Sequence, residues 1–341
     1  MRKWLLRILA AVLALGLIAA YEILWAPNSF EGDRSITVSR GENFQRVLDS
    51  LEIGGIIRSR ALIDAAGRIL GLTTKMQVGK YRFTSGMSNR EMLEDLRSGR
   101  TIEPITVMLP EGVKAARQAK ILARTLGIDS LRYMTLVYDS NFAHTLGVQA
   151  TSLEGYLMPD TYRLYWQMDE EQIIREQVGE FWKFMNDSLR GRLDSADKSL
   201  NDVLVLASIV NGETAIDSER AKVAGVYYNR LERRMRLEAD PTVQFILVDG
   251  PRRLRLSDLH RESPYNTYRN YGLPPGPIGN PGRASILAAL FPVRHRYLFF
   301  VANGQGGHTF TRTYLEHRRA ARRYRKFRDE QEAMREEEFS R

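Results

Sequence analysis

An apolar run near the start of this 341-residue chain is the feature that most limits how it can fold. The run extends from Ile8 to Tyr21 and continues to Trp25 after a single acidic residue, Glu22. A helix needs about 20 apolar residues to cross the hydrocarbon core of a bilayer, and this stretch is close to that length. The sequence therefore predicts a transmembrane helix within residues 1–25, followed by a folded body.

Charged and small residues around the run indicate its orientation in the membrane and whether it is retained or cleaved. Arg2, Lys3 and Arg7 precede the run, which predicts a cytoplasmic N-terminus and a body on the outer face of the cytoplasmic membrane. Ala19 and Ala20 also suit a signal-peptide cleavage site, so a removed leader is the alternative. We favour a retained single-pass anchor. A lipoprotein is excluded because the chain contains no cysteine.

The charge balance and the missing cysteines narrow the possible functions. A formal net charge of +9 suits an anionic partner such as nucleic acid, an acidic membrane surface or an acidic polymer. A solvated arginine-rich surface explains the same charge. The sequence has no zinc-ligand spacing, no ribonucleoprotein-type aromatic motif and no clear basic recognition helix, so we expect no nucleic-acid binding. Without cysteine or a HExxH motif, we expect neither a metal nor another cofactor.

Residues 35–104 are expected to form a small α+β unit. A β-type stretch at residues 36–38 precedes helical patterns at 44–51 and 59–70, and a strand follows at 78–83. Ser88 is placed to cap a third helix that Gly99 closes. This order resembles a LysM-like glycan-binding module. A purely structural domain that holds the catalytic unit away from the membrane is the alternative.

Residues 105–322 are expected to form a larger α+β domain, and residues 323–341 a charged helical tail. A strand and turn at 106–112 open the domain, and residues 240–281 are rich in turns. A buried strand is expected at 297–301. Helices are predicted at residues 113–126, 170–189, 200–213 and 218–234.

The helix that ends at Glu213 carries the strongest chemical signal. Seven of the eight residues from Val203 to Val210 are apolar, so this helix should be buried on nearly all sides. Desolvation and the negative end of the helix dipole would both raise the pKa of Glu213. A glutamate with a pKa of about 6 suits a general acid near neutral pH. A surface carboxylate or the partner of an arginine would look the same in this segment alone.

Two loops beyond this helix carry side chains suited to sugars. SPYNTY (263–268) and GLPPGPI (272–278) present tyrosine, asparagine and threonine on a backbone stiffened by proline and glycine. Aromatic faces and amides are common partners of sugar rings and N-acetyl groups. GGHTF (306–310) places His308 on a tight turn, where a histidine is more often structural than catalytic.

Six ordered motifs carry a resemblance to a known family. They are LEGYLMPDTY (153–162), LASIVNGET (206–214), DPTV (240–243), SPYNTY, GLPPGPI and GGHTF. From about residue 105 to 322 the chain is similar to the YceG-like endolytic murein transglycosylases, and the anchor and first unit match more loosely. That family typically has two acids in a SIVExE-type segment. Here Asn211 stands at the first acidic position and Glu213 at the second.

The resemblance implies cleavage of the MurNAc-β-1,4-GlcNAc bond inside peptidoglycan strands, which would leave 1,6-anhydro-MurNAc ends and limit strand length. Glu213 would be the only catalytic acid and base. The expected partners are the glycan strands and the cell-wall synthases, the penicillin-binding proteins. The residues expected to bind substrate are Tyr265, Asn266 and Thr267, with Glu154, Tyr156, Asp240, Thr242, His308 and Asn211 in support.

Two other functions stay open at this point. A hydrolytic muramidase would need a second acid at the cleft, such as Glu154 or Asp240. A glycan-binding scaffold of the wall-synthesis machinery would bind strands without cutting them, and Asn211 keeps that alternative open.

Overall fold

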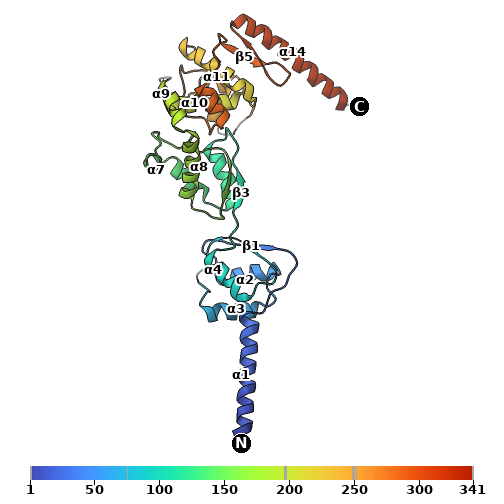
Figure 1. The fold of residues 1–341 in the computed structure, drawn as a ribbon. Helices are drawn as coiled ribbons and strands as arrows, with labels where there is room; N and C mark the ends of the chain where they lie inside the picture. The colour runs from blue at the N-terminus through green and yellow to red at the C-terminus, as the bar shows by residue number, and fades with distance from the viewer. Residues whose placement is uncertain (1, 75, 196–197, 248–249, 251, 340–341) are drawn as a thin grey trace. The chain divides into compact units, whose positions relative to one another are not determined.

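The computed structural model describes residues 2–74, 76–195, 198–247, 250 and 252–339 (Figure 1). The chain divides into two compact units. The first comprises Met1–Val107, Leu122–Asp129 and Thr161–Asp169, and the second comprises Met108–Ile121, Ser130–Asp160 and Glu170–Arg341. Helices and two-stranded sheets occur together, which confirms the α+β class.

The first unit has the predicted order of strand, helix, helix, strand and helix. Its elements are α1 (Arg2–Leu24), β1 (Arg34–Val38), α2 (Phe44–Ile53), α3 (Arg60–Leu70), β2 (Gly79–Phe83) and α4 (Asn89–Ser98). The strands β1 and β2 are antiparallel, with Ile36 opposite Tyr81. Tyr81 and Phe83 are fully buried in the apolar core of this unit.

Local signals explain the bounds of α4. The Ser88 side chain accepts a hydrogen bond from Glu91 N at 3.3 Å, and the Glu91 carboxylate accepts one from Ser88 N at 2.7 Å. This reciprocal pair is a capping box, which satisfies two amides that a helix start leaves free. Gly99 ends the helix with a left-handed φ of 72°, as the sequence predicted.

Within α1, residues Lys3–Leu24 form a helix that is long and apolar enough to span a membrane. Its C-terminal end is attached to the first unit. Ile23 and Leu24 pack against the core, Glu22 forms an ion pair with Arg58 at 2.6 Å, and Asn89 donates to Ile23 O. The apolar helix therefore leads into a folded body without a flexible linker.

The rest of the chain contains most of the helices. In order these elements are β3 (Ile105–Met108), α5 (Ala115–Leu126), α6 (Ser130–Val137), α7 (Ser140–Thr145), β4 (Thr161–Leu164), α8 (Glu170–Phe184), α9 (Asp187–Ser195), α10 (Leu200–Glu213), α11 (Asp217–Glu232), α12 (Asp240–Ile246), the short 3-10 helix η1 (Asp258–His260), α13 (Arg283–Leu290), β5 (Phe299–Ala302), β6 (His308–Thr311) and α14 (Tyr314–Phe339). β3 pairs with β4, and β5 pairs with β6.

The helix α10 is the centre of the second unit. Ser199 caps it by accepting a hydrogen bond from Asp202 N, and all residues from Val203 to Val210 are buried. The helices α11, α12 and α13 pack around it. The predicted buried helix and its end at Glu213 are therefore confirmed.

Several sequence predictions need correction. Residues 170–189 form two helices, because α8 ends at Phe184 and Asn186 begins the next turn by accepting from Leu189 N. The turn-rich region contains α12, where Pro241 lies in the first turn, a position that proline tolerates. The helix α13 was not predicted.

The hairpin also differs from its prediction. β5 is half-buried rather than fully buried, and within the described part of the chain it pairs with β6 alone. His308 is the first residue of β6 and lies opposite Ala302, so it follows the turn rather than forming it.

Candidate active site

Glu213 is the last residue of α10 and lies against the neighbouring helix α11. Its carboxylate accepts a hydrogen bond from the Tyr227 hydroxyl at 2.7 Å, and Tyr227 is itself buried. No other hydrogen bond to this carboxylate occurs in the part of the chain that the structure describes. Glu213 remains partly exposed. One side of the carboxyl group is thus oriented by a buried phenol, and the group can still meet a substrate.

The surroundings of Glu213 suit proton transfer near neutral pH. Burial raises the pKa of this carboxyl from its usual 4.5 to about 7, and the negative charge of Asp240 adds to the rise. The Tyr227 hydrogen bond and the charge of Arg230 act in the opposite direction but are outweighed. Both protonation states are then populated near pH 7, so one group can donate a proton and later accept one.

Close packing of α12 on α10 brings Asp240 near Glu213. A Cβ atom on Gly212 would lie 2.6 Å from the Pro241 Cβ, so only glycine permits this approach. The Tyr268 hydroxyl donates to the Asp240 carboxylate at 2.6 Å. Burial and this hydrogen bond raise the pKa of Tyr268, which keeps its hydroxyl protonated. Asp240 is therefore beside the candidate acid and already bound to a phenol.

Asn211 lies on a different face of α10 from Glu213, since residues two apart on a helix do not face each other. Its side-chain oxygen accepts from Gly282 N at 3.2 Å, from the Ser285 hydroxyl at 3.2 Å and from Arg220 at 3.4 Å. Arg220 is buried. Asn211 is thus part of the contact between α10, α11 and α13, away from the carboxyl group of Glu213.

Glu154 is a buried glutamate of the second unit, and only 5% of it is exposed. It accepts hydrogen bonds from Ala115 N and from the Asn280 side chain, both at 2.9 Å. Burial raises its pKa to about 7, although these hydrogen bonds and nearby Lys114 act to lower it. Asn280 also accepts from Gly155 N at 2.8 Å. Glu154 therefore connects its own loop to the start of α5 and to the loop that contains Asn280.

The three residues that the sequence predicted to line the sugar site, Tyr265, Asn266 and Thr267, differ in burial. Asn266 and Thr267 are buried, whereas Tyr265 is half-buried. Asn266 donates to Leu259 O and Arg261 O. The Thr267 hydroxyl lies 2.9 Å from that of Thr242 and accepts from Ala239 N. These buried side chains hold the loop that carries Tyr265 and Tyr268.

Tyr265 belongs to a cluster that can contact a sugar. Its ring lies 4.7 Å from that of Phe245, and the Lys114 ammonium lies 4.5 Å from the centre of the Phe245 ring. Burial lowers the pKa of Lys114. Burial raises the pKa of Tyr265, and the charge of Glu154 adds to it. Two aromatic rings, a cation and a phenol hydroxyl are the kinds of group that bind glycans.

The two remaining predicted residues are engaged elsewhere. Tyr156 is 3% exposed, and its ring packs edge-on against Phe181 at 5.1 Å. His308 Nδ1 lies 2.6 Å from the Glu219 carboxylate, which also accepts from His308 N. This pair attaches β6 to α11.

Five residues around the candidate site were not predicted from the sequence: Tyr227, Tyr268, Phe245, Lys114 and Asn280. Tyr268 belongs to the SPYNTY motif, so attention to every hydroxyl in that motif would have found it. Nothing in the sequence distinguishes Tyr227 from the adjacent Tyr228 as the partner of Glu213. Among the described residues, no group of three or more His, Asp or Glu side chains could hold a metal ion.

Comparisons with known proteins indicate the family to which the chain is related. The YceG-like family model matches residues 36–323. The chain is 28% identical over 305 residues to an endolytic murein transglycosylase of Bacillus subtilis, which covers 85% of this chain and 84% of the relative. It is 26% identical to a protein of the same name from Streptococcus pneumoniae, covering 81% of this chain but only 55% of that longer relative.

A solved structure supports the same assignment. A crystal structure of a yceG-like protein from Listeria monocytogenes superposes with a TM-score of 0.61 and 28% sequence identity, over 85% of this chain and 99% of that one. The family model, the curated relatives and the fold all agree, and the protein therefore belongs to the YceG-like family.

Proposed function

We propose that this protein is an endolytic murein transglycosylase that cuts the MurNAc-β-1,4-GlcNAc bond within nascent glycan strands. The observation that carries the proposal is Glu213, a single carboxyl at the end of a buried helix with a pKa of about 7. Family membership and the names of the curated relatives support the same activity.

In the proposed mechanism Glu213 acts first as an acid and then as a base. Protonated Glu213 donates to the O4 oxygen of the leaving GlcNAc as the C1–O4 bond breaks. The resulting carboxylate takes the proton of the muramic C6 hydroxyl, whose oxygen bonds to C1 and closes a 1,6-anhydro ring. Glu213 ends protonated and ready for another cycle, and no water is consumed. A pKa near the working pH favours both steps.

The described contacts argue against Glu154 as a second acid. A muramidase needs a second carboxyl that is free to act as a base or nucleophile. Glu154 is occupied by Ala115 N and Asn280, whereas Asp240 is exposed and accepts one hydrogen bond, from Tyr268, so the product ends have to distinguish a one-acid scheme from one in which Asp240 takes part. In the one-acid scheme Asp240 raises the pKa of Glu213, and Tyr268 holds Asp240 in place.

Substrate contacts are proposed for the partly exposed groups. Tyr265, Phe245 and Lys114 would contact a sugar ring. The buried side chains of Asn266, Thr267, Thr242 and Glu154 would hold the loops around it. Asn211, Tyr156 and His308 would support the packing of the helices and the hairpin.

We further propose that α1 is a retained single-pass anchor in the cytoplasmic membrane, with the N-terminus inside. The first unit would be a LysM-like module that binds glycan. Its attachment to α1 through Arg58 and Asn89 would keep it near the membrane surface, where synthases produce new strands. Those synthases, the penicillin-binding proteins, are the proposed partners.

The test is mass analysis of products from uncross-linked glycan strands and the full chain in detergent. Wild type should produce anhydro-muramyl ends, and Glu213→Gln should lose at least about 1000-fold in rate. Glu232→Gln is the matched control, because Glu232 is also the last residue of a helix but is exposed. Reducing ends would indicate a muramidase, and binding without cleavage would indicate a scaffold.

A further inference from the structure

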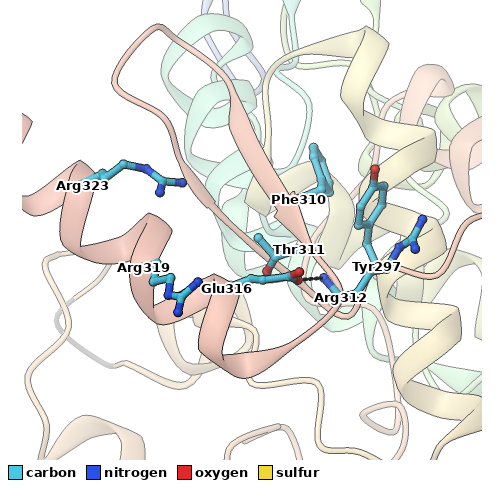
Figure 2. A pocket seen from close by; sticks show the side chains of 7 residues that line it. All are labelled: Tyr297, Phe310, Thr311, Arg312, Glu316, Arg319 and Arg323. Atoms are coloured by element: carbon cyan, nitrogen blue, oxygen red, sulfur yellow. Dashed lines mark hydrogen bonds between the residues drawn. The ribbon is translucent and has the colours of Figure 1, made fainter.

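A pocket of about 430 Å³ lies between the β5–β6 hairpin and the first half of α14 (Figure 2). Tyr297, Phe310 and Thr311 line it on the hairpin side. Figure 2 shows Arg323 reaching from α14 into this space. The pocket shares no residue with the Glu213 site, and all of its lining residues belong to the second unit.

Thr311 gives the first sign that this pocket has a ligand. It is 9% exposed, and its hydroxyl has no hydrogen-bond partner among the described residues. A buried hydroxyl without a partner destabilises a protein, so such groups in native proteins usually have a use. A polar ligand group in the pocket would supply the missing partner.

The charges around the pocket select an anion. Arg312, Arg319 and Arg323 line it, and none of them forms an ion pair within the described part of the chain. Residues 316, 319 and 323 follow helical spacing, so they lie along one side of α14. Glu316 is the one acidic residue in the lining, and it already accepts from Arg312 N and Thr313 N at the helix start.

The aromatic side of the pocket adds another cation and an apolar surface. The Lys222 ammonium lies 4.4 Å from the centre of the Phe310 ring, and the Arg312 guanidinium lies 5.9 Å from that of Tyr297. Among the neighbouring acids, Glu219 is paired with His308. The pocket thus combines positive charge, one free hydroxyl and aromatic carbon.

We propose that this pocket binds a carboxylate of the peptide stem that the muramic residues of peptidoglycan carry. This inference rests on the proposed function, because the substrate strand brings the stems to this unit. Arginine pairs with a carboxylate through two parallel hydrogen bonds, and Thr311 would donate a third. The small alkyl side chains of a stem would pack on Phe310 and Tyr297. The pocket would make the enzyme prefer strands that carry peptides.

The test compares strands that carry stems with the same strands stripped by an amidase. In the double variant Arg319→Gln and Arg323→Gln, KM for peptide-carrying strands should rise roughly tenfold while kcat stays unchanged. Cleavage of stripped strands should not change. The matched control is Arg318→Gln with Arg322→Gln, which removes the same charge at the same spacing from α14 but not from this pocket.

A second variant separates binding from folding. Thr311→Val keeps the side-chain shape and removes the unpartnered hydroxyl, so the protein should be no less stable while KM for peptide-carrying strands rises about threefold. A purely structural role for Thr311 would leave KM unchanged. An equal KM for both kinds of strand in the wild type and all variants would overturn the inference and leave the proposed function intact.

A binding measurement tests the inference even if the protein cuts no strand and the proposed function is wrong. Calorimetry of the full chain with a free stem tetrapeptide should show binding that the Arg319/Arg323 double variant loses. Inorganic phosphate and vesicles of anionic lipid are the comparison probes. Binding of these probes without binding of the tetrapeptide would overturn the inference in favour of a phosphate ligand.

Discussion

The second unit contains two glutamates whose pKa values are both raised to about 7, yet their surroundings differ. Glu154 is almost fully buried and accepts hydrogen bonds from a backbone amide and an asparagine. Glu213 is partly exposed and accepts one hydrogen bond, from a phenol. A raised pKa therefore does not identify a catalytic acid by itself. Glu154 and Glu213 differ in the number of partners that they have already bound, and the predictions below test whether this difference separates a structural carboxyl from a reactive one.

The largest expected effect is on stability as a function of pH. Folding raises both pKa values, so each glutamate contributes stability that is complete below pH 4.5 and is lost as pH rises through about 7. The change is at most about 3 kcal/mol for Glu154 and smaller for Glu213, because water screens a partly exposed group. Urea unfolding at pH 5 and pH 8 should show a shallower pH dependence in Glu154→Gln than in Glu213→Gln. A shallower pH dependence in Glu213→Gln than in Glu154→Gln would contradict the assignment of Glu154 as the more deeply buried carboxyl.

Removing the Glu154 side chain should affect stability more than chemistry. Glu154→Ala leaves Ala115 N without an acceptor and removes one of the two hydrogen bonds that the Asn280 amide donates, which should lower the free energy of unfolding by about 2 kcal/mol. The folded fraction should retain the kcat of the wild type. Thermal unfolding and active-site-normalised rates measure the two quantities, and a loss of kcat comparable with that of Glu213→Gln would give Glu154 a chemical role.

Tyr227→Phe tests the orientation of the Glu213 carboxyl, the proposed catalytic acid. The phenol hydrogen bond acts to lower the pKa of Glu213, so its loss should raise that pKa further. The wild-type rate should fall above about pH 7 as Glu213 loses its proton, and in the variant this decline should move to higher pH. We expect kcat at pH 7 to fall about tenfold because the carboxyl is less well positioned. A pH–rate profile measures both changes, with Tyr228→Phe on the same helix as the control.

The smallest effect is expected at Asn211, the position for which the sequence motif predicts an acid. Asn211→Asp keeps the oxygen that Gly282 N and Ser285 donate to and adds a charge beside buried Arg220. We expect kcat to change by no more than about twofold and the protein to become slightly more stable. A large gain in kcat would mean that an acid at position 211 can take part in the reaction.

Much of the fold was predictable because its signals are local. The capping pair of Ser88 and Glu91 and the apolar stretch of α10 lie within a few residues of one another. The sequence did not predict the helices α12 and α13. For α12 the reason is the proline in its first turn, which resembles a turn signal. The end of α8 was also predicted too late, because the helical pattern of the sequence continues past the break at residues 185–186.

The sequence by itself determined the apolar N-terminal helix, the α+β class, the family and the position of Glu213 at the end of a buried helix. Only the tertiary structure showed that Tyr227 binds Glu213, that Tyr268 binds Asp240 and that Asn211 accepts from Gly282 N and Ser285. It also showed that Asn266 and Thr267 are buried in a loop, and that Thr311 lines a positively charged pocket. Local patterns decide which residues form a helix, but the packing of helices decides which residues meet. The burial and hydrogen bonds that set the pKa of an acid arise only from that packing.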